Sequence, residues 1–156
     1  MQFSWIDYDK TAHSLIEDWL DEDGRYFTAC EDGWDANYEY WKNEPDTGPN
    51  GNYWCKVVYR EETPVAAILL ASDGEVLHIM EILTAPGERG KGYGSGLLKE
   101  LVSCGTEIIG HEIRQADACI FADNARSQKA FEKAGFAFEK AHPDGDVWYY
   151  SYRAMN

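Results

Sequence analysis

Residues 86–98 read PGERGKGYGSGLL, a glycine-rich stretch between two apolar segments. The segment before it, Val76–Thr84, has the composition of a strand, and the segment after it, Leu97–Ile109, has the apolar spacing of a helix. A turn of this kind exposes the unpaired N–H groups of the helix start together with the positive end of the helix dipole. Because glycines let a ligand approach the main chain closely, the stretch predicts a site for a phosphorylated ligand.

Two other phosphate-binding motifs fit this stretch poorly. A P-loop requires Ser or Thr after its lysine, whereas Lys91 is followed by Gly92. The dinucleotide-binding fingerprint, counted from Gly90 and Gly92, requires a third glycine at the position of Ser95. The alternative to a phosphate-binding site is a flexible glycine-rich loop that binds no ligand.

A specific family resemblance rests on two blocks of sequence. The order Arg89-x-x-Gly92-x-Gly94 resembles the pyrophosphate-binding signature of the GNAT superfamily of N-acetyltransferases. A second block, residues 124–136, reads NARSQKAFEKAGF and resembles the second motif of that family. The two blocks stand in the family's order and at its usual separation, so the resemblance is specific over about residues 75–136. It implies an acyltransferase that takes an acetyl group from acetyl-CoA.

The composition indicates a single acidic domain spanning residues 1–156. Lys and Arg number 14 against 28 Asp and Glu, so the formal net charge is -14 at pH 7. Nucleic acid and anionic membrane surfaces repel such a protein, so we expect neither as a partner. The same charge favours a cationic substrate, although a requirement for solubility explains it equally well.

The spacing of cysteines and histidines gives no sign of a metal site. The four cysteines, at positions 30, 55, 104 and 119, include no Cys-x-x-Cys pair, and the four histidines show no ligand spacing. The first twenty residues do not resemble a signal peptide, and no apolar run approaches the roughly 20 residues that span a bilayer. We therefore expect a cytoplasmic protein with reduced cysteines and no metal.

Patterns along the chain predict a mixed α+β fold, which agrees with what the resemblance implies. Strands are expected at residues 2–7, 53–60, 65–71, 75–84, 116–122, 136–140 and 147–153. About four helices are expected. The first is capped by Asp9 or Thr11 and ends in a turn at 21–24, and the others lie at residues 34–42, 92–111 and 124–134, with a loop at 44–51. The resemblance further implies a mostly antiparallel central sheet of about seven strands that splay apart at the CoA cleft.

The resemblance also assigns roles in cofactor binding. In the family, the N–H groups of the glycine-rich turn hold the pyrophosphate, and the end of the preceding strand holds the pantetheine arm and the acetyl carbonyl. An N–H at that strand end stabilises the oxyanion that forms when an amine attacks. The implied cofactor-binding residues are Ile82, Leu83, Thr84, Arg89, Gly90, Lys91, Gly92, Tyr93, Gly94, Ser95, Asn124 and Phe131.

Acetyl transfer to nitrogen requires a neutral amine. Deprotonating an ammonium of pKa near 10.4 at pH 7 costs roughly 4.6 kcal/mol, and a carboxylate can take that proton. Glu81, at the cleft end of its strand, is the expected base, and a sheet-edge glutamate without a role is the alternative. His78 is the second candidate, and we expect it on Met80's face of the strand rather than on Glu81's.

The chain departs from the family pattern at Phe131. Many relatives have a tyrosine there that donates a proton to the leaving CoA thiolate, and a phenyl ring cannot do so. A thiol of pKa about 8.5 leaves tolerably as the thiolate, so activity does not require the donor. Tyr149 and Tyr150 of the closing strand are substitutes for it, and Tyr149 is the expected catalytic residue.

Acids and aromatics crowd residues 17–46, where the family commonly builds its acceptor groove. Carboxylates attract ammonium groups, and aromatic faces add cation–π contacts. We expect Trp34, Asp35 and Tyr38 to contact a small cationic amine, such as a polyamine or an aminoglycoside. The alternative is a solvated helix pair whose aromatics pack in the core. The later run of residues 143–145 also looks like that of some aminoglycoside 6′-N-acetyltransferases.

Three functions remain open at this point. The first is an acetyl-CoA-dependent N-acetyltransferase for a small cationic amine. The second uses the same chemistry on a protein or peptide. The third is a CoA-binding module without catalysis, which the phenylalanine at position 131 keeps open. The resemblance also allows a homodimer.

Overall fold

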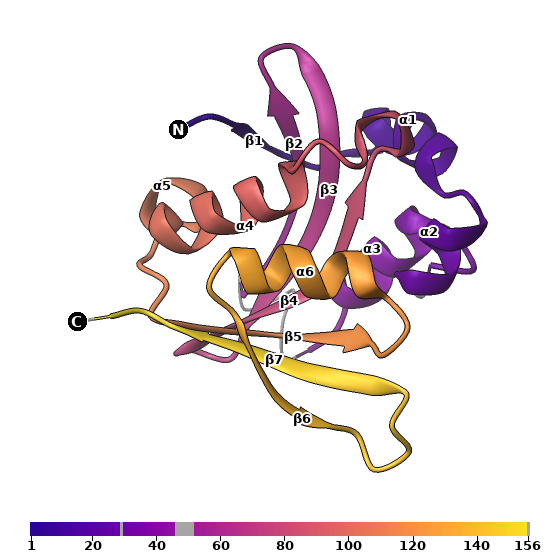
Figure 1. The fold of residues 1–156 in the computed structure, drawn as a ribbon. Helices are drawn as coiled ribbons and strands as arrows, with labels where there is room; N and C mark the ends of the chain where they lie inside the picture. Colours follow the sequence, from indigo (N-terminus) through magenta and orange to yellow (C-terminus); the bar gives the residue numbers. More distant parts are fainter. Residues whose placement is uncertain (29, 46–51, 156) are drawn as a thin grey trace.

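A computed structural model describes residues 1–28, 30–45 and 52–155 of the chain. Within them a central sheet has seven strands in the order β1-β2-β3-β4-β5-β7-β6 (Figure 1). The strands are β1 Ser4–Asp7, β2 Tyr53–Arg60, β3 Thr63–Ser72, β4 Val76–Thr84, β5 Gln115–Phe121, β6 Ala137–Ala141 and β7 Val147–Arg153. Of the neighbouring pairs in this sheet, β4 and β5 run parallel and the others antiparallel. The predicted mostly antiparallel α+β sheet is therefore confirmed.

Helices cover both faces of the sheet. The described residues form α1 His13–Trp19, α2 Glu22–Phe27, α3 Trp34–Lys42, α4 Tyr93–Ser103, α5 Gly105–Ile109 and α6 Ala125–Lys133, with short 3-10 helices η1 Lys10–Ala12 and η3 Pro86–Glu88. Helices α4, α5 and α6 bury their apolar residues against one face, and α1 and α3 bury theirs against the other. Figure 1 shows α4 and α6 lying across the front of the sheet.

The described residues form six α-helices where about four were expected, for two local reasons. The turn expected at residues 21–24 instead starts α2, because the Asp21 side chain accepts a hydrogen bond from the Gly24 N–H at 2.8 Å and caps the helix. The helix expected at 92–111 breaks at Cys104. A Cβ on Gly105 would lie 2.6 Å from the His111 carbonyl oxygen, so glycine permits the close packing at this break. Of the loop expected at 44–51, residues 46–51 lie outside the described part.

Strand β3 shows how the two cores arise. Ile68 and Leu70 belong to the core under α4–α6, whereas Ala67 and Leu69 belong to the core under α1 and α3. Successive side chains of a strand point to opposite faces, so a strand covered on both sides reads as a continuous apolar run. This arrangement places β3 and its neighbour β4 at the centre of the molecule, with helices on either side.

Strands β4 and β5 separate part of the way along. Their parallel pairing begins at Val76 opposite Gln115 and ends at Ile79 opposite Ala118. Beyond that point β4 continues to Thr84 and β5 continues to its own end without pairing to each other. The splay that the resemblance implied is therefore present between these two strands.

A β-bulge in β4 changes the direction of one candidate base. Leu69 pairs with Glu81 and Leu70 pairs with Ile79, so Met80 is the extra residue. Opposite residues in a ladder share a face. His78 lies opposite Ala71, two residues from Leu69 on β3, so His78 and Glu81 share the α1–α3 face. The expectation that they face opposite ways was wrong, because it assumed a regular strand.

Other properties bear on the type of site. No helix in the described ranges is both long and apolar enough to cross a membrane. Among the described residues, no group of three or more His, Cys, Asp or Glu side chains is placed to hold a metal ion. The four cysteines are free thiols, and Cys30 and Cys55 are buried.

Candidate active site

The glycine-rich turn after β4 leads into a helix start whose N–H groups are not capped by a described side chain. Gly90 and Gly92 have φ values of 81° and 82°, in the left-handed region that glycine adopts without strain. Gly92 is the N-cap of α4, and no side chain among the described residues caps this end. The first hydrogen bond of the helix runs from the Gly96 N–H to the Gly92 carbonyl at 3.1 Å. The N–H groups of residues 93–95 therefore have no carbonyl partner within the helix.

A cavity of about 260 Å³ lies against this turn. Its walls are the turn, the end of β4 and one face of α6. It brings together nine expected cofactor residues: Ile82, Thr84, Arg89, Gly90, Gly92, Tyr93, Gly94, Ser95 and Phe131. Leu83 and Lys91 are not in its lining, since Leu83 is buried in the α1–α3 core and the Lys91 ammonium pairs with Glu88 at 3.0 Å.

The cations that line this cavity without a described carboxylate partner are not the two that were expected from the sequence. The Arg89 guanidinium is bound by Asp21, and the Lys91 ammonium by Glu88, so carboxylates neutralise both expected cations. Helix α6 supplies three further cations that sequence reasoning missed. They are Arg126, Lys129 and Lys133. Their spacing of three and four residues, which places side chains on one helix face, is the signal that could have revealed them.

A second cavity occupies the gap between the separated strands. It is lined by residues 79–82 of β4 and 118–121 of β5, together with Phe27, Asn124, Ser127 and Phe131. Ile82, Ser127 and Phe131 line the first cavity as well, so the two adjoin. The Phe131 side chain is buried with its ring edge-on to Phe136, and the centroids are 5.0 Å apart. The expected cofactor residues Asn124 and Phe131 thus lie in the gap.

Glu81 is among the described residues that line the gap, and His78 is not. Burial raises the pKa of the Glu81 carboxyl to about 9, and a hydrogen bond with the Asn37 side chain acts in the opposite direction. His78 instead bonds two carboxylates, with Nδ1 2.6 Å from Asp117 Oδ1 and Nε2 3.1 Å from Asp73 Oδ2. The geometry therefore favours Glu81 as the group that meets a ligand in the gap.

A third cavity, of about 530 Å³, adjoins the gap at Phe121. Its lining consists of Tyr26, Cys30, Glu31, Asp32, Gly33, Ala36, Asn37, Tyr40 and Phe121. Two carboxylates, from Glu31 and Asp32, and the aromatic rings of Tyr26, Tyr40 and Phe121 are therefore part of this lining. Such a lining suits an ammonium group, because carboxylates attract it and aromatic faces add cation–π contacts.

The three residues expected to contact the substrate, Trp34, Asp35 and Tyr38, lie on other faces of α3 and are not among the described lining of this cavity. Trp34 is fully buried in the α1–α3 core. The Asp35 carboxylate accepts a hydrogen bond from the Tyr8 hydroxyl at 2.9 Å, and Tyr38 packs beside the rings of Tyr8 and Tyr53. Apolar, acidic and aromatic residues occur all around this helix, so its sequence alone did not reveal which face meets the cavity.

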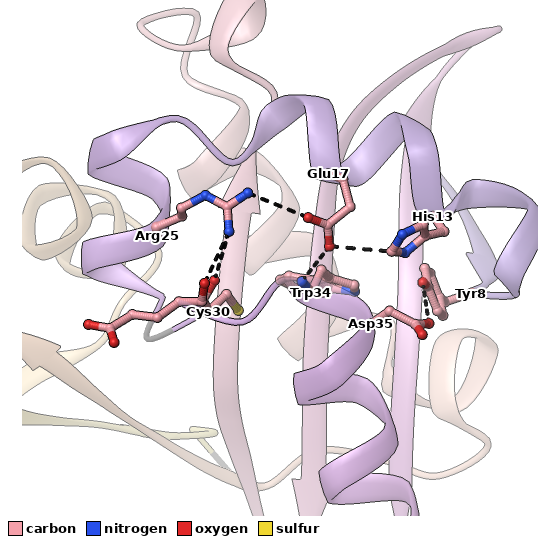
Figure 2. A network of polar contacts seen from close by, with 8 residues as sticks. Tyr8, His13, Glu17, Arg25, Cys30, Trp34 and Asp35 are labelled. Atoms are coloured by element: carbon pink, nitrogen blue, oxygen red, sulfur yellow. Dashed lines mark hydrogen bonds and ion pairs between the residues drawn. The ribbon is translucent and has the colours of Figure 1, made fainter.

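Figure 2 shows a polar network centred on Glu17, which lies beside residues 30–33 of the third cavity's lining. The backbone N–H of Trp34, at the start of α3, donates to Glu17 Oε1 at 2.8 Å, and Arg25 Nη2 lies 3.6 Å from Glu17 Oε2. Arg25 Nη1 also donates to the carbonyl oxygens of Cys30 and Glu31 at 3.5 and 3.3 Å. Gly33 has a φ of 97°, and a Cβ there would lie 2.6 Å from Glu17. The loop from 30 to 33 is thereby held between α1 and α2.

The two candidate tyrosines of β7 are not among the described residues that line the gap. Tyr149 lies opposite Cys119 in the sheet, and the Lys140 ammonium sits 5.5 Å from its ring centroid. Tyr150 is buried, and its hydroxyl donates to Glu132 at 3.3 Å. Neither residue is among the described lining of the three cavities. Among the described residues, the lining of the gap therefore includes Phe131 and no tyrosine of this strand.

Comparison with known proteins identifies relatives in sequence and in structure. The model of the acetyltransferase (GNAT) family matches residues 14–136. The uncharacterized N-acetyltransferase YfmK of Bacillus subtilis (strain 168) is 35% identical over 81 residues, which are 52% of this chain and 53% of that protein. The match thus spans about half the length of this relative.

Two solved structures share the whole architecture. Spermidine N-acetyltransferase from Vibrio cholerae, in complex with CoA and spermine, has a TM-score of 0.77 at 14% identity, covering 97% of this chain and 95% of that one. AAC(6')-Ib, in complex with ribostamycin and coenzyme A, has a TM-score of 0.73 at 17% identity, covering 98% and 94%. At these identities the likeness shows the fold.

Proposed function

The chain belongs to the acetyltransferase (GNAT) family, and on that premise we propose that it transfers an acetyl group from acetyl-CoA to a primary amine of a small cationic molecule. One observation carries this proposal. The anion-binding turn, the gap that holds Glu81 and the acidic, aromatic cavity adjoin in that order. Donor, base and acceptor sites are thus adjacent along one path through the sheet.

The first cavity suits the diphosphate end of acetyl-CoA. The N–H groups of residues 93–95 and the dipole of α4 attract anions, and Arg126, Lys129 and Lys133 line the same cavity. From there the pantetheine arm extends along the end of β4 and brings the thioester to the gap beside Phe131. The two solved structures described above contain coenzyme A, which supports this placement.

Glu81 serves as the base that frees the amine. An ordinary carboxylate of pKa near 4.3 takes a proton from an ammonium of pKa near 10.4 at a cost of about 8 kcal/mol. The Glu81 pKa of about 9 reduces the difference to about 1.4 units, or about 2 kcal/mol. Burial therefore makes the ionised Glu81 a much stronger base, although the carboxyl must first lose its own proton.

The transfer itself needs few further groups. The neutral nitrogen attacks the thioester carbon, the new C–N bond forms, and the C–S bond breaks. The nitrogen releases its remaining extra proton to solvent, and CoA leaves as the thiolate, because Phe131 has no proton to give. A thiol pKa near 8.5 makes the thiolate a tolerable leaving group.

The third cavity holds the rest of the acceptor. Glu31 and Asp32 provide negative charge, and the rings of Tyr26 and Tyr40 provide cation–π surfaces. This assigns the acceptor to the face of α3 that carries Asn37 and Tyr40. The solved relatives hold the amines spermine and ribostamycin, which supports an amine of the polyamine or aminoglycoside class.

A thiol-release assay with acetyl-CoA tests this function on a panel of spermine, spermidine, kanamycin and a lysine-containing peptide. We expect turnover on at least one small cation and none on the peptide. Turnover on the peptide alone would replace the proposal with a protein acetyltransferase. Calorimetric binding of acetyl-CoA without release on any amine would replace it with a CoA-binding module.

A further inference from the structure

Arg89 belongs to two parts of the molecule. It lines the cavity against the glycine-rich turn, and its guanidinium is bound by a carboxylate of the opposite helix layer. Arg89 Nη1 donates to Asp21 Oδ2 at 2.7 Å, and Nη2 donates to Asp21 Oδ1 at 3.2 Å. The pair is bidentate, the geometry that most strongly orients a guanidinium. The hydrogen bond and the charge of the Arg89 guanidinium hold the pKa of the Asp21 carboxyl below its usual range.

Asp21 also organises helix α2. Its Oδ1 accepts the Gly24 N–H at 2.8 Å and so caps the helix. Gly24 is buried, and a Cβ there would lie 3.3 Å from the Leu83 side chain, so α2 packs directly on the end of β4. One carboxylate thus joins the turn after β4 to the start of α2.

Helix α2 in turn forms part of the gap and of the acceptor cavity. Tyr26 lines the third cavity and stacks on Phe121, with ring centroids 5.2 Å apart. Phe27 lines the gap and lies 6.4 Å from the same ring. The Tyr26 hydroxyl donates to Asp123 at 3.2 Å. A shift of α2 would therefore reshape the boundary between the gap and the acceptor cavity.

We propose that Asp21 is a positioning residue that holds α2 against the acceptor cavity and, in doing so, lowers the affinity of the turn for the CoA diphosphate. The reason is competition for one guanidinium. Arginine has N–H donors only, and the carboxylate and the diphosphate are rival acceptors for them. This inference rests on the proposed function, because it requires CoA at the turn.

Asp21→Asn separates this role from a structural one. Asparagine has nearly the same shape and is an equally good N-cap, so α2 keeps its cap while Arg89 loses its ionic partner. We expect the Kd for CoA to fall about three- to fivefold, since a partly exposed ion pair is worth up to about 1 kcal/mol. Amide hydrogen exchange in residues 22–27 should become faster in the same variant, because α2 loses its link to the turn.

Three controls sharpen the test. Asp23→Asn removes the same charge from the first turn of α2, two residues from Asp21, and should leave CoA affinity and exchange unchanged. S-acetylpantetheine has no diphosphate, so Asp21→Asn should not alter its Kd. Arg89→Gln should speed exchange in α2 as Asp21→Asn does, but should weaken CoA binding.

The outcomes are distinguishable. Tighter CoA binding with faster α2 exchange in Asp21→Asn supports the inference. Weaker or unchanged CoA binding in that variant overturns it, as does tightening of the same size in Asp23→Asn. A wild-type protein that does not bind CoA would overturn the proposed function as well.

Discussion

His78 Nδ1 lies 2.6 Å from Asp117 Oδ1, and the two residues face each other across β4 and β5 one step before the pairing of these strands ends. Asp73 contacts the other ring nitrogen at 3.1 Å. Two carboxylates thus hold one imidazole at the closed end of the gap. The contact lies outside the described lining of the cavities, so its contribution should be to stability.

The first prediction concerns the pH dependence of this contact. Burial opposes protonation of His78, but Asp117 and Asp73 outweigh it and raise the His78 pKa above its usual 6.5. A raised pKa adds stability that is complete below pH 6.5 and is lost as pH rises through the folded-state value. His78→Gln should therefore lower the free energy of unfolding by about 0.5–1 kcal/mol at pH 6 and by less at pH 9. Urea unfolding measures both, and an equal loss at the two pH values would contradict the assignment.

The second prediction concerns Glu81 as the base. Because its pKa is about 9, the rate of acetyl transfer should rise with pH up to about that value as the carboxyl ionises. Glu81→Gln should lower kcat by about 100-fold at pH 7.5 and move the rise towards the pKa of the free amine, near 10.4. Steady-state rates from pH 6.5 to 10.5 check this. A variant with the wild-type profile would remove Glu81 from the mechanism.

Gly92 provides the third prediction. Its left-handed φ of 82° costs any other residue about 1–2 kcal/mol, and a side chain there would crowd a bound phosphate. Gly92→Val should weaken CoA binding about tenfold or more, as measured by calorimetry. Gly87→Val is the matched control, because Gly87 lies in the same turn with free space around it and is not among the positive-φ glycines described. Equal effects of both changes would argue against a special role for Gly92.

The cations of α6 give the fourth prediction. Lys129 lines the first cavity, so Lys129→Gln should raise the Kd for CoA about two- to fivefold at low ionic strength and by less at 0.5 M salt. Lys140→Gln makes the same charge change on β6, where the ammonium lies over Tyr149 instead. That control should leave the Kd unchanged. A salt-independent effect of Lys129→Gln would point to packing rather than charge.

Regular elements of the fold could be predicted from the sequence because their local patterns agree with their packing. The bounds of α3 and β2 match the predicted 34–42 and 53–60. The turn after β4 could be recognised because glycines with left-handed φ leave a distinct trace, here at Gly90 and Gly92. Helix α2 could not be predicted, because its acidic start at Asp21 is equally typical of the end of α1.

The site depended on features that have no local pattern. The bulge at Met80 turns Glu81 towards α1–α3, and no glycine or proline marks it in the sequence. The face of α3 that meets the third cavity, with Asn37 and Tyr40, is set by how the helix packs on the sheet. The pairing of Arg89 with Asp21 joins residues 68 positions apart, which periodicity does not reach.

A crystal structure with acetyl-CoA bound tests the central claim most directly. We expect the diphosphate within hydrogen-bond distance of the N–H groups of residues 93–95, and the thioester carbonyl between residues 79–82 of β4 and 118–121 of β5. Acetyl-CoA bound elsewhere, or a complex in which these two strands pair along their full length, would contradict the account.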